Sequence, residues 1–224
     1  MSIPNPAAAA TLVIIAKAPV AGRSKTRLCP PCSFEQAAAL ADAALRDTLA
    51  TVAAVPGPRR RLLVLDGRAD GLAPAGFELY RQCPGGLGDR LAGAFTAADG
   101  PALLVGMDTP QLEVAHLERA LAALARPGVD AVLGPAPDGG YWAIGLVRPD
   151  ERVFDGVPMS TSETGARQSA RLDELGLAVA ELEPLRDVDT WADARSVADA
   201  RPGSRFARAL GEIEARLAEV PSRP

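Results

Sequence analysis

Short apolar runs alternate with longer helix-forming stretches along this chain. A continuous apolar run is typical of a strand that is buried on both faces of a parallel sheet, and longer apolar periodicity indicates a helix. We predict strands at residues 12–16, 61–65, 77–80, 102–107, 131–134, 142–146 and 177–182. We predict helices at residues 34–54, 89–98, 114–125 and 163–175.

Helix start and stop signals support this alternation. Ser33 and Gln36 have the spacing of a capping box, and the Pro-Gly-Pro run that begins at Pro56 ends the first helix. Thr190 is placed to cap a short helix that runs to about residue 200. Strands and helices in this order predict an α/β, Rossmann-like fold, with a mostly parallel, mixed sheet that is flanked by helices.

The domain organisation follows from the same pattern, since no linker divides the chain. We expect a mobile N-terminus at residues 1–10, a single α/β domain at residues 11–200, and a C-terminal helix within residues 201–224 that packs on the domain. The chain has 224 residues, of which 48% are hydrophobic. That is enough apolar surface for one full core.

Charge and hydropathy narrow the possible partners. The formal net charge is −4, which argues against a protein that binds nucleic acid with its whole surface. The first apolar run is too short to span a membrane, and no cationic segment precedes it as in a secretory signal. We therefore expect a cytoplasmic protein with no nucleic-acid and no membrane partner.

Cysteine and histidine are too few for several common sites. Three cysteines give no disulfide framework, and Cys29 and Cys32 lack the further pair or histidine that a zinc site needs. Their segment is better interpreted as an ordinary loop. His116 is the single histidine, and its alanine- and leucine-rich surroundings favour an ordinary helix residue over a member of a Ser-His-Asp triad.

A cationic loop follows the first predicted strand. It contains Gly22, which permits close approach of the backbone to a ligand, and then Arg23, Lys25 and Arg27. Its spacing fits neither a Walker loop nor a dinucleotide-binding glycine turn. The loop is either a phosphate site or a surface loop with solvated charges.

Carboxylates occur where other strands end. Asp108 follows a buried strand, and Asp187 and Asp189 are separated by one residue, so that both carboxylates point to the same side of an extended segment. Ligands collect at the carboxyl ends of strands in open α/β sheets, and carboxylates there can hold a divalent cation. Each aspartate could instead serve as a helix cap or turn residue.

Two glycine-rich segments complete the set. Asp138 precedes Gly139 and Gly140, which is a turn signal between strands and also lets a ligand approach the backbone. The segment at residues 83–90 precedes a helix and suits main-chain contact with a nucleobase or phosphate. The common position of these segments at strand ends predicts one shared site.

The motifs also carry a family resemblance. Their order is Ala16-Lys17-Ala18-Pro19, Gly22-Arg23, Lys25-Thr26-Arg27-Leu28, Gly88-Asp89-Arg90-Leu91, Gly106-Met107-Asp108-Thr109-Pro110, residues 133–141 and Asp187-Val188-Asp189-Thr190. In this combination, from about residue 11 to residue 200, the chain resembles the rSAM/selenodomain-associated transferase family. The resemblance implies a glycosyltransferase-A-type, nucleotide-diphospho-sugar transferase fold and glycosyltransferase activity in residues 11–200.

A second resemblance is to the guanylyltransferases that activate phospholactate or phosphoenolpyruvate. It lies at residues 25–28, 108–110 and 187–190, where the Lys-Thr-Arg loop of those enzymes handles a nucleoside triphosphate and three aspartates hold magnesium. The resemblance implies that Asp108, Asp187 and Asp189 bind Mg²⁺ or Mn²⁺ here. Met159 stands where a tryptophan usually precedes the Ser-Thr pair.

Two enzymatic hypotheses follow, and a non-catalytic nucleotide-binding protein is the third. The first is a glycosyltransferase that moves a sugar from a nucleotide sugar to a small-molecule acceptor. The second is a nucleotidyltransferase that uses a nucleoside triphosphate and releases pyrophosphate. The oligomeric state stays open. The expected catalytic residues are Asp108, Lys25 and Asp138; the nucleotide-binding residues are Ala18, Pro19, Gly22, Arg23, Lys25, Arg27, Gly86, Leu87 and Gly88; the substrate-binding residues are Asp138, Gly139, Gly140, Tyr141, Ser160 and Thr161.

Overall fold

The computed structural model describes residues 10–69 and 71–219. Residues 1–9 of the expected mobile N-terminus lie outside the described residues. In this part of the chain one seven-stranded sheet has the order β3-β2-β1-β4-β6-β5-β7. The strands are β1 (Thr11–Lys17), β2 (Arg60–Asp66), β3 (Glu78–Arg81), β4 (Ala102–Val105), β5 (Ala131–Pro135), β6 (Tyr141–Leu146) and β7 (Val179–Glu181).

The sheet is mixed and mostly parallel, as the sequence predicts. β6 runs antiparallel to both of its neighbours, β4 and β5. The other neighbouring strands pair in parallel. The amino end of β6 therefore lies at the same edge of the sheet as the carboxyl ends of β1 and β4.

The helices lie close to their predicted positions. Ser33 and Gln36 form the expected capping box: the Ser33 amide donates to Gln36 Oε1 at 2.7 Å, and the Gln36 amide donates to Ser33 Oγ at 3.2 Å. The helices are α1 (Phe34–Ala54), α2 (Leu87–Ala98), α3 (Val114–Leu124), α4 (Thr164–Glu174), α5 (Trp191–Ala200) and α6 (Arg205–Glu219), with 3-10 turns η2 (Thr26–Leu28) and η3 (Glu151–Phe154).

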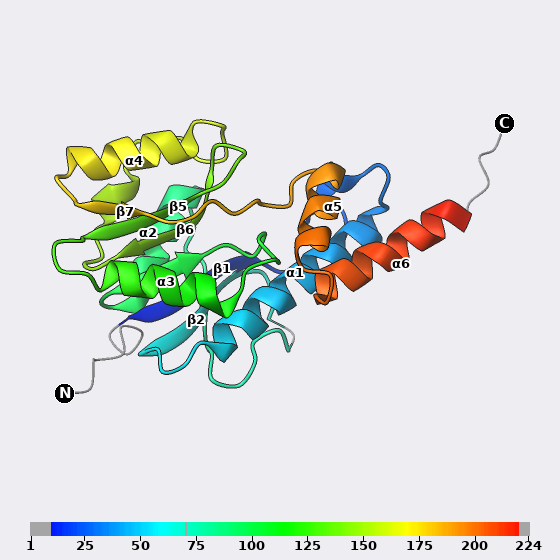
Figure 1. Cartoon of the computed structure of the whole chain (residues 1–224), viewed down its shortest axis with the longest axis horizontal. Helices are drawn as coiled ribbons and strands as arrows, with labels where there is room; N and C mark the ends of the chain where they lie inside the picture. The colour runs from blue at the N-terminus through cyan, green and yellow to red at the C-terminus, as the bar shows by residue number, and fades with distance from the viewer. Residues whose placement is uncertain (1–9, 70, 220–224) are drawn as a thin grey trace.

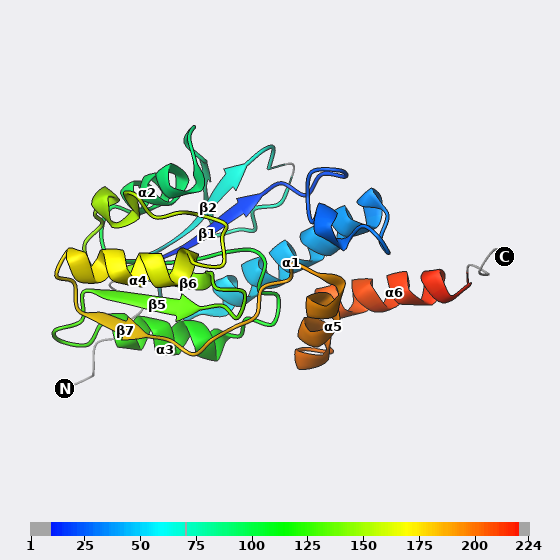
Figure 2. The same cartoon turned by 90° about the horizontal axis from the view of Figure 1, so that it is seen from above.

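Helices cover both faces of the sheet (Figures 1 and 2). Leu12 and Ile14 of β1 pack in one buried cluster with side chains of α1 and α3, whereas Val13 packs in a second cluster with α2 and α4. This is the alternation that the period-two geometry of a strand requires. Both faces of β1 are thus buried, in agreement with its uninterrupted apolar sequence.

A third cluster lies at one end of the molecule, beside the sheet. There α5 and α6 pack against the N-terminal half of α1, and Figure 1 shows α6 extending away from the sheet. Val188, which precedes α5, is buried in this cluster with Leu28 of η2. The segment that contains Asp187 and Asp189 therefore runs from the sheet to the α5–α6 pair.

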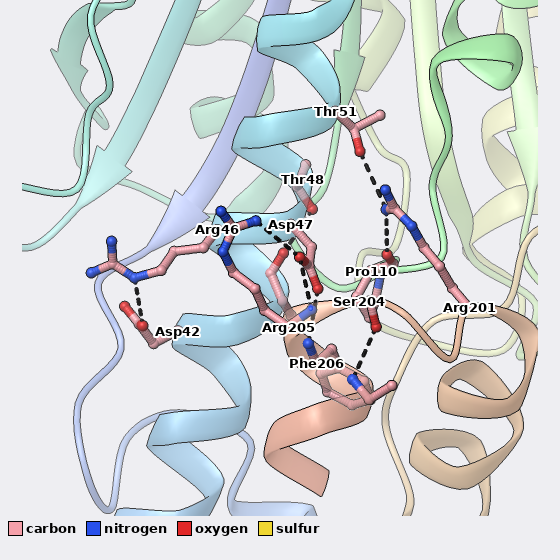
Figure 3. Close-up of polar contacts among 12 residues, drawn as sticks. Asp42, Arg46, Asp47, Thr48, Thr51, Pro110, Arg201, Ser204, Arg205 and Phe206 are labelled. Carbon is pink, nitrogen blue, oxygen red and sulfur yellow. Dashed lines mark hydrogen bonds and ion pairs between the residues drawn. The ribbon is translucent and has the colours of Figure 1, made fainter. Parts of the chain in front are cut away.

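Two sets of polar contacts attach α5 and α6 to the body (Figure 3). The Asp47 carboxylate of α1 accepts hydrogen bonds from the backbone amides of Arg205 and Phe206, at 3.1 and 2.9 Å, and so caps the first turn of α6. Arg201 Nη1 donates to the carbonyl oxygens of Pro110 and Leu112, at 3.0 and 2.8 Å. Arg201 thereby connects the end of α5 to the loop that follows Asp108.

The described helices include none that is both long enough and apolar enough to cross a bilayer. The remaining differences from the predicted elements lie at their ends. β4 ends at Val105 rather than at residue 107, although the Gly106 amide still donates to the Trp142 carbonyl oxygen of β6 at 3.3 Å.

Candidate functional site

A cavity of about 890 Å³ opens at the edge of the sheet where β1 and β4 end and β6 begins. Its volume is within the range of small-molecule sites. The walls come from the cationic loop after β1, the segment before α2, the loop after β4, the β5–β6 turn, the segment before α4 and the segment before α5. The predicted convergence of these segments is what the fold produces.

Lys25 lies at the centre of the carboxylates. Its Nζ is 2.9 Å from Asp108 Oδ1 and 3.4 Å from Asp189 Oδ1, and it also donates to the Val188 carbonyl oxygen. Only 12% of the Lys25 side chain is exposed, so water contributes little to the solvation of its ammonium group. The two aspartates therefore converge on one cationic point.

The charge of Lys25 is stabilised by this environment. Burial lowers the pKa of its ammonium group, but the nearby carboxylates, chiefly Asp108, raise the pKa by more, and the net pKa is above its ordinary value. Lys25 also has a left-handed backbone, with φ of 50°. Such strain in a non-glycine residue is found mainly where the surroundings hold it in place, as at binding sites.

Asp187 differs from Asp108 and Asp189 because its carboxylate is bonded to a hydroxyl. Thr109 Oγ1 donates to Asp187 Oδ1 at 2.7 Å. Burial, with the charges of Asp108 and Asp138, raises the pKa of the Asp187 carboxyl to about 6, although Thr109 and Lys25 act in the opposite direction. The three predicted metal aspartates thus face one cavity in three different environments.

The fit of a divalent cation depends on Lys25. Carboxylate oxygens are the hard ligands that Mg²⁺ and Mn²⁺ bind. Within residues 10–69 and 71–219, however, no three histidine, cysteine or carboxylate side chains surround one point closely enough to hold a metal ion. The ammonium group of Lys25 takes the position between Asp108 and Asp189. The donor chemistry fits a divalent cation, and the three-aspartate metal site stays a prediction.

The other cations at the end of β1 and in the loop after it are less constrained. Arg27 Nη1 pairs with Asp189 Oδ2 at 2.9 Å, and its side chain is 72% exposed. Lys17 and Arg23 line the cavity and form no ion pair with any residue that the structure describes. Positive charge is therefore available for an anionic ligand on this side of the cavity.

The glycine-rich segment before α2 forms another wall. Gly85 has φ of 113°, and the Asp89 carboxylate accepts a hydrogen bond from the Gly86 amide at 2.8 Å. Gly86 and Leu87 line the cavity, whereas Gly88 is not among the lining residues and lies beside Phe154 and Met159. The expected ligand contact at Gly88 stays a prediction.

The β5–β6 turn and the segment before α4 form one continuous wall. The Gly165 amide donates to the Gly139 carbonyl oxygen at 2.8 Å, and Asp138 Oδ1 accepts from the Gly140 amide at 2.9 Å. Asp138 is thus both a turn residue and a side chain at the cavity. Tyr141 donates its hydroxyl to Gln168 Oε1 at 3.3 Å, and burial raises the pKa of that hydroxyl, which stays neutral.

Most predicted site residues meet at this cavity. Ala18, Pro19, Gly22, Gly88 and Gly139 do not line it. Gly22 has a φ of 74° in the turn of the loop after β1, and Gly139 packs against the backbone of Ser162 in the segment before α4. Those that do line it are Arg23, Lys25, Arg27, Gly86, Leu87, Asp108, Asp138, Gly140, Tyr141, Ser160, Thr161, Asp187 and Asp189.

The structure adds residues that the sequence analysis did not select. Gln82 donates to the carbonyl oxygens of Ala16 and Val64, at 2.8 and 3.2 Å, and accepts from Arg90 at 3.4 Å. Arg90 also pairs with Asp66 at 3.0 Å. Arg90 lies in the Gly88-Asp89-Arg90-Leu91 motif and could have been selected there, whereas nothing local marks Gln82.

Cys29, Cys32 and His116 take no part in the cavity lining. Both cysteines are free thiols, and burial raises the pKa of Cys32 to about 11. His116 Nδ1 accepts the backbone amide of Glu113 at 3.0 Å at the start of α3. His116 also lies 3.8 Å from Glu183 Oε1 and makes an edge contact with the ring of Trp142.

A family model described as an uncharacterized protein conserved in bacteria (DUF2064) matches residues 39–161, which is just over half of the chain. The chain belongs to the DUF2064 family. The curated proteins include no match to it. The family named by resemblance in the sequence analysis is a finer assignment and stays a prediction.

Solved structures share the fold. One from Desulfovibrio desulfuricans G20, assigned as a nucleotide-diphospho-sugar transferase, has a TM-score of 0.81 and 24% identity over 93% of this chain and 97% of its own. A cytidylyltransferase from Leptospira borgpetersenii has a TM-score of 0.58 and 11% identity, over 96% of this chain and 98% of its own.

CMP:2-keto-3-deoxy-manno-octonic acid synthetase in complex with CTP has a TM-score of 0.56 and 13% identity, over 90% of this chain and 99% of its own. At these identities the likeness shows the fold. The DUF2064 chain has the nucleotide-diphospho-sugar transferase type of α/β fold, which nucleotidyltransferases also use.

Proposed function

We propose that this protein is a divalent-metal-dependent transferase that uses a nucleotide-activated donor, and that it moves a sugar from a nucleotide-diphospho-sugar to a small-molecule acceptor. One observation carries the proposal. Asp108 and Asp189 converge on the Lys25 ammonium group, at 2.9 and 3.4 Å, in a cavity whose first loop also presents cations. A cationic point held by carboxylates, beside further cations, is the chemistry that binds a metal-bound diphosphate.

The proposed roles follow from these positions. Lys17, Arg23, Lys25 and Arg27 pair with the phosphates, and Gly86 and Leu87 contact the nucleoside through the segment before α2. Asp108 and Asp189, with Asp187 beside them, would hold Mg²⁺ or Mn²⁺, which stabilises the negative charge of the leaving diphosphate. The Lys25 ammonium group, displaced by the metal from between these aspartates, would then pair with a phosphate oxygen and add to that stabilisation.

The acceptor is assigned to the wall that is formed by the β5–β6 turn and the segment before α4. Asp138, Gly140, Tyr141, Ser160 and Thr161 are the proposed contacts with the sugar and acceptor. Asp138 Oδ1 is held by the Gly140 amide, and Asp138 is the proposed general base for the attacking hydroxyl or a hydrogen-bond partner of the sugar. The resemblance to the rSAM/selenodomain-associated transferases and the structural likeness at a TM-score of 0.81 support glycosyl transfer.

Nucleotidyl transfer is the second candidate, and the positive charge at the end of β1 and in the loop after it favours this reaction. Lys17 and Arg23 line the cavity without an ion pair among the described residues, and a triphosphate needs more positive charge than a diphosphate does. In this reaction a phosphate-bearing substrate attacks the α-phosphorus of a nucleoside triphosphate and pyrophosphate leaves.

Thermal unfolding of the purified protein tests the proposal. Nucleotide sugars and nucleoside triphosphates are compared, each with Mg²⁺, with Mn²⁺ and with a chelator. A ligand at about 100 times its Kd adds about 2.7 kcal/mol to the free energy of unfolding and raises Tm by several degrees. We expect a metal-dependent rise with one nucleotide sugar, followed by release of its nucleoside diphosphate when an acceptor is supplied.

The other results separate the alternatives. A metal-dependent rise with a triphosphate, together with pyrophosphate release, would transfer the assignment to nucleotidyl transfer. Absence of any shift across both ligand classes would reject both enzymatic assignments in favour of a non-catalytic protein.

A further inference from the structure

The positively charged side chains of the cavity are confined to some of its walls. The five cations that line it, Lys17, Arg23, Lys25, Arg27 and Arg90, come from the end of β1, the loop after it and α2. The wall that is built from the β5–β6 turn and residues 159–164 contributes no cation to the lining. Arg167, the cation nearest to this wall in the sequence, pairs with Glu163 at 3.4 Å and does not line the cavity.

This second wall, which we call the hydroxyl wall, consists of Asp138, Gly140, Tyr141, Met159, Ser160, Thr161, Ser162 and Thr164. It carries several hydroxyl groups and one carboxylate. Among the described residues the hydroxyls of Ser160 and Ser162 have no hydrogen-bond partner, whereas Thr164 Oγ1 donates to the Pro158 carbonyl oxygen at 2.8 Å. Two of the hydroxyls are therefore free to bond a ligand.

The backbone of the hydroxyl wall is held in place. Thr164 Oγ1 accepts from the Thr161 amide at 3.0 Å, and the Gly165 amide bonds to Gly139 at 2.8 Å. Ser160 has a left-handed backbone, with φ of 61°. A non-glycine residue in this region is held by its surroundings, as is common at binding sites.

We propose that the hydroxyl wall binds an acceptor that carries hydroxyl groups and no anionic group, either neutral or amine-bearing. Free hydroxyls donate to and accept from sugar or polyol hydroxyls. A phosphate or carboxylate placed here would meet the Asp138 carboxylate with no cation on the same wall, whereas an amine would pair with that carboxylate.

This inference rests on the proposed function only where it calls the bound molecule an acceptor. Recognition of that molecule depends on the hydroxyl wall alone. It also bears on the choice between the two reactions. The nucleotidyl alternative needs a phosphate-bearing substrate, and the hydroxyl wall has no cation for it. The charge of the wall therefore favours glycosyl transfer.

Ligand-observed NMR on the full chain tests the inference with matched pairs: glucose and glucose 6-phosphate, glucosamine and glucosamine 6-phosphate. Each pair is measured alone and with a nucleoside diphosphate and Mn²⁺. We expect glucose and glucosamine to bind at least tenfold more tightly than their phosphate esters. Equal or tighter binding of the esters, or binding of no member in either condition, would overturn the inference.

Two variants locate the binding. Asp138→Asn keeps an acceptor for the Gly140 amide and removes the charge, so it should reduce the ratio of glucosamine to glucose affinity about tenfold. Glu163→Gln, outside the cavity lining, should leave the ratio unchanged. An unchanged ratio in Asp138→Asn would overturn the role of that carboxylate. If the sugars bind but no nucleotide raises Tm in the thermal-unfolding test, the proposed function is wrong, whereas the inferred class of acceptor is still supported.

Discussion

Lys25 illustrates how one side chain sets the charge of a cavity. Its ammonium group is buried between two carboxylates, and a residue that is 163 positions further along the chain supplies a carbonyl oxygen. Without this cation, Asp108 and Asp189 would repel each other in a partly buried space. Any metal that binds these aspartates must compete with an ammonium group that is already present.

The substitution Asp108→Asn separates a ligand role from a structural one. The Asp108 carbonyl oxygen accepts from the Val188 amide at 2.9 Å, and this backbone bond survives the substitution. Lys25 keeps its contacts with Asp189 and Val188. We expect a loss of about 1 kcal/mol or less in the free energy of unfolding.

The metal-dependent thermal shift and transfer should both fall sharply, with transfer reduced at least about 100-fold. Asp42→Asn, in an exposed pair with Arg46 at 2.7 Å, is the matched control for urea unfolding and for turnover. Full metal-dependent turnover by Asp108→Asn would remove Asp108 from the proposed metal site.

Gly139 and Gly22 provide a comparison of crowding at similar backbone angles. Both have positive φ, of 90° and 74°. A Cβ on Gly139 would lie 2.0 Å from the Ser162 carbonyl oxygen, whereas a Cβ on Gly22 would have no atom within 4 Å. Alanine at either position costs about 1 kcal/mol for the left-handed backbone.

We therefore expect Gly22→Ala to cost about 1 kcal/mol and Gly139→Ala about 2 kcal/mol more, because the hydroxyl wall must move. Urea unfolding measures both. Equal losses in the two variants would mean that residues 160–164 adapt without strain.

At the scale of elements, α6 depends on a residue of α1 for its first turn. Asp47 is 3% exposed and accepts the Arg205 and Phe206 amides, with Arg205 Nη1 a further 3.3 Å contact. A carboxylate at a helix N-terminus satisfies free amides and interacts favourably with the helix dipole. Asp47 thus stabilises the α5–α6 pair, whose preceding segment carries Asp187 and Asp189.

We expect Asp47→Ala to lower the free energy of unfolding by about 3 kcal/mol, since it leaves buried amides without partners. Asp42→Ala lies in the same helix but removes an exposed ion pair, and it should cost about 0.5 kcal/mol or less. Because both variants gain the same helix propensity, the difference between them measures the cap. A difference below about 1 kcal/mol in urea unfolding would contradict this role.

At the scale of the whole molecule, α1 joins the sheet to the α5–α6 pair. Leu45 and Leu49 pack in the cluster on the sheet, whereas Leu40 and Ala44 pack with α5 and α6. Loss of either cluster would expose one side of the same helix. The two parts should therefore unfold together.

The two tryptophans test this cooperativity, since Trp142 lies in β6 and Trp191 begins α5. In the single-tryptophan variants Trp142→Phe and Trp191→Phe, the urea midpoint from fluorescence should equal the midpoint from far-UV circular dichroism of the same variant. An earlier fluorescence midpoint for Trp191 would show that α5 and α6 unfold as a separate unit.

The sequence alone determined the elements and their approximate ends, because these depend on local patterns. The capping box at Ser33, the helix at Phe34–Ala54 and the apolar strands are set by residues that are neighbours in the chain. The convergence of Lys25, Asp108 and Asp189 was also predictable, since strand ends meet at one edge of an α/β sheet.

Only the tertiary structure decided the contacts within that edge. Strand order and helix rotation, which local sequence does not encode, decide these contacts. Examples are the position of Lys25 beside Asp108, the hydrogen bond of Gln82 to the Ala16 carbonyl oxygen, and the position of Gly88 beside Phe154. The turn signal at Asp138 already implies that β6 reverses direction after β5, whereas the antiparallel pairing of β6 with β4 is decided only in the assembled sheet. The charge of each wall is thus a property of the folded chain, because it is set by segments that meet only after the sheet has formed.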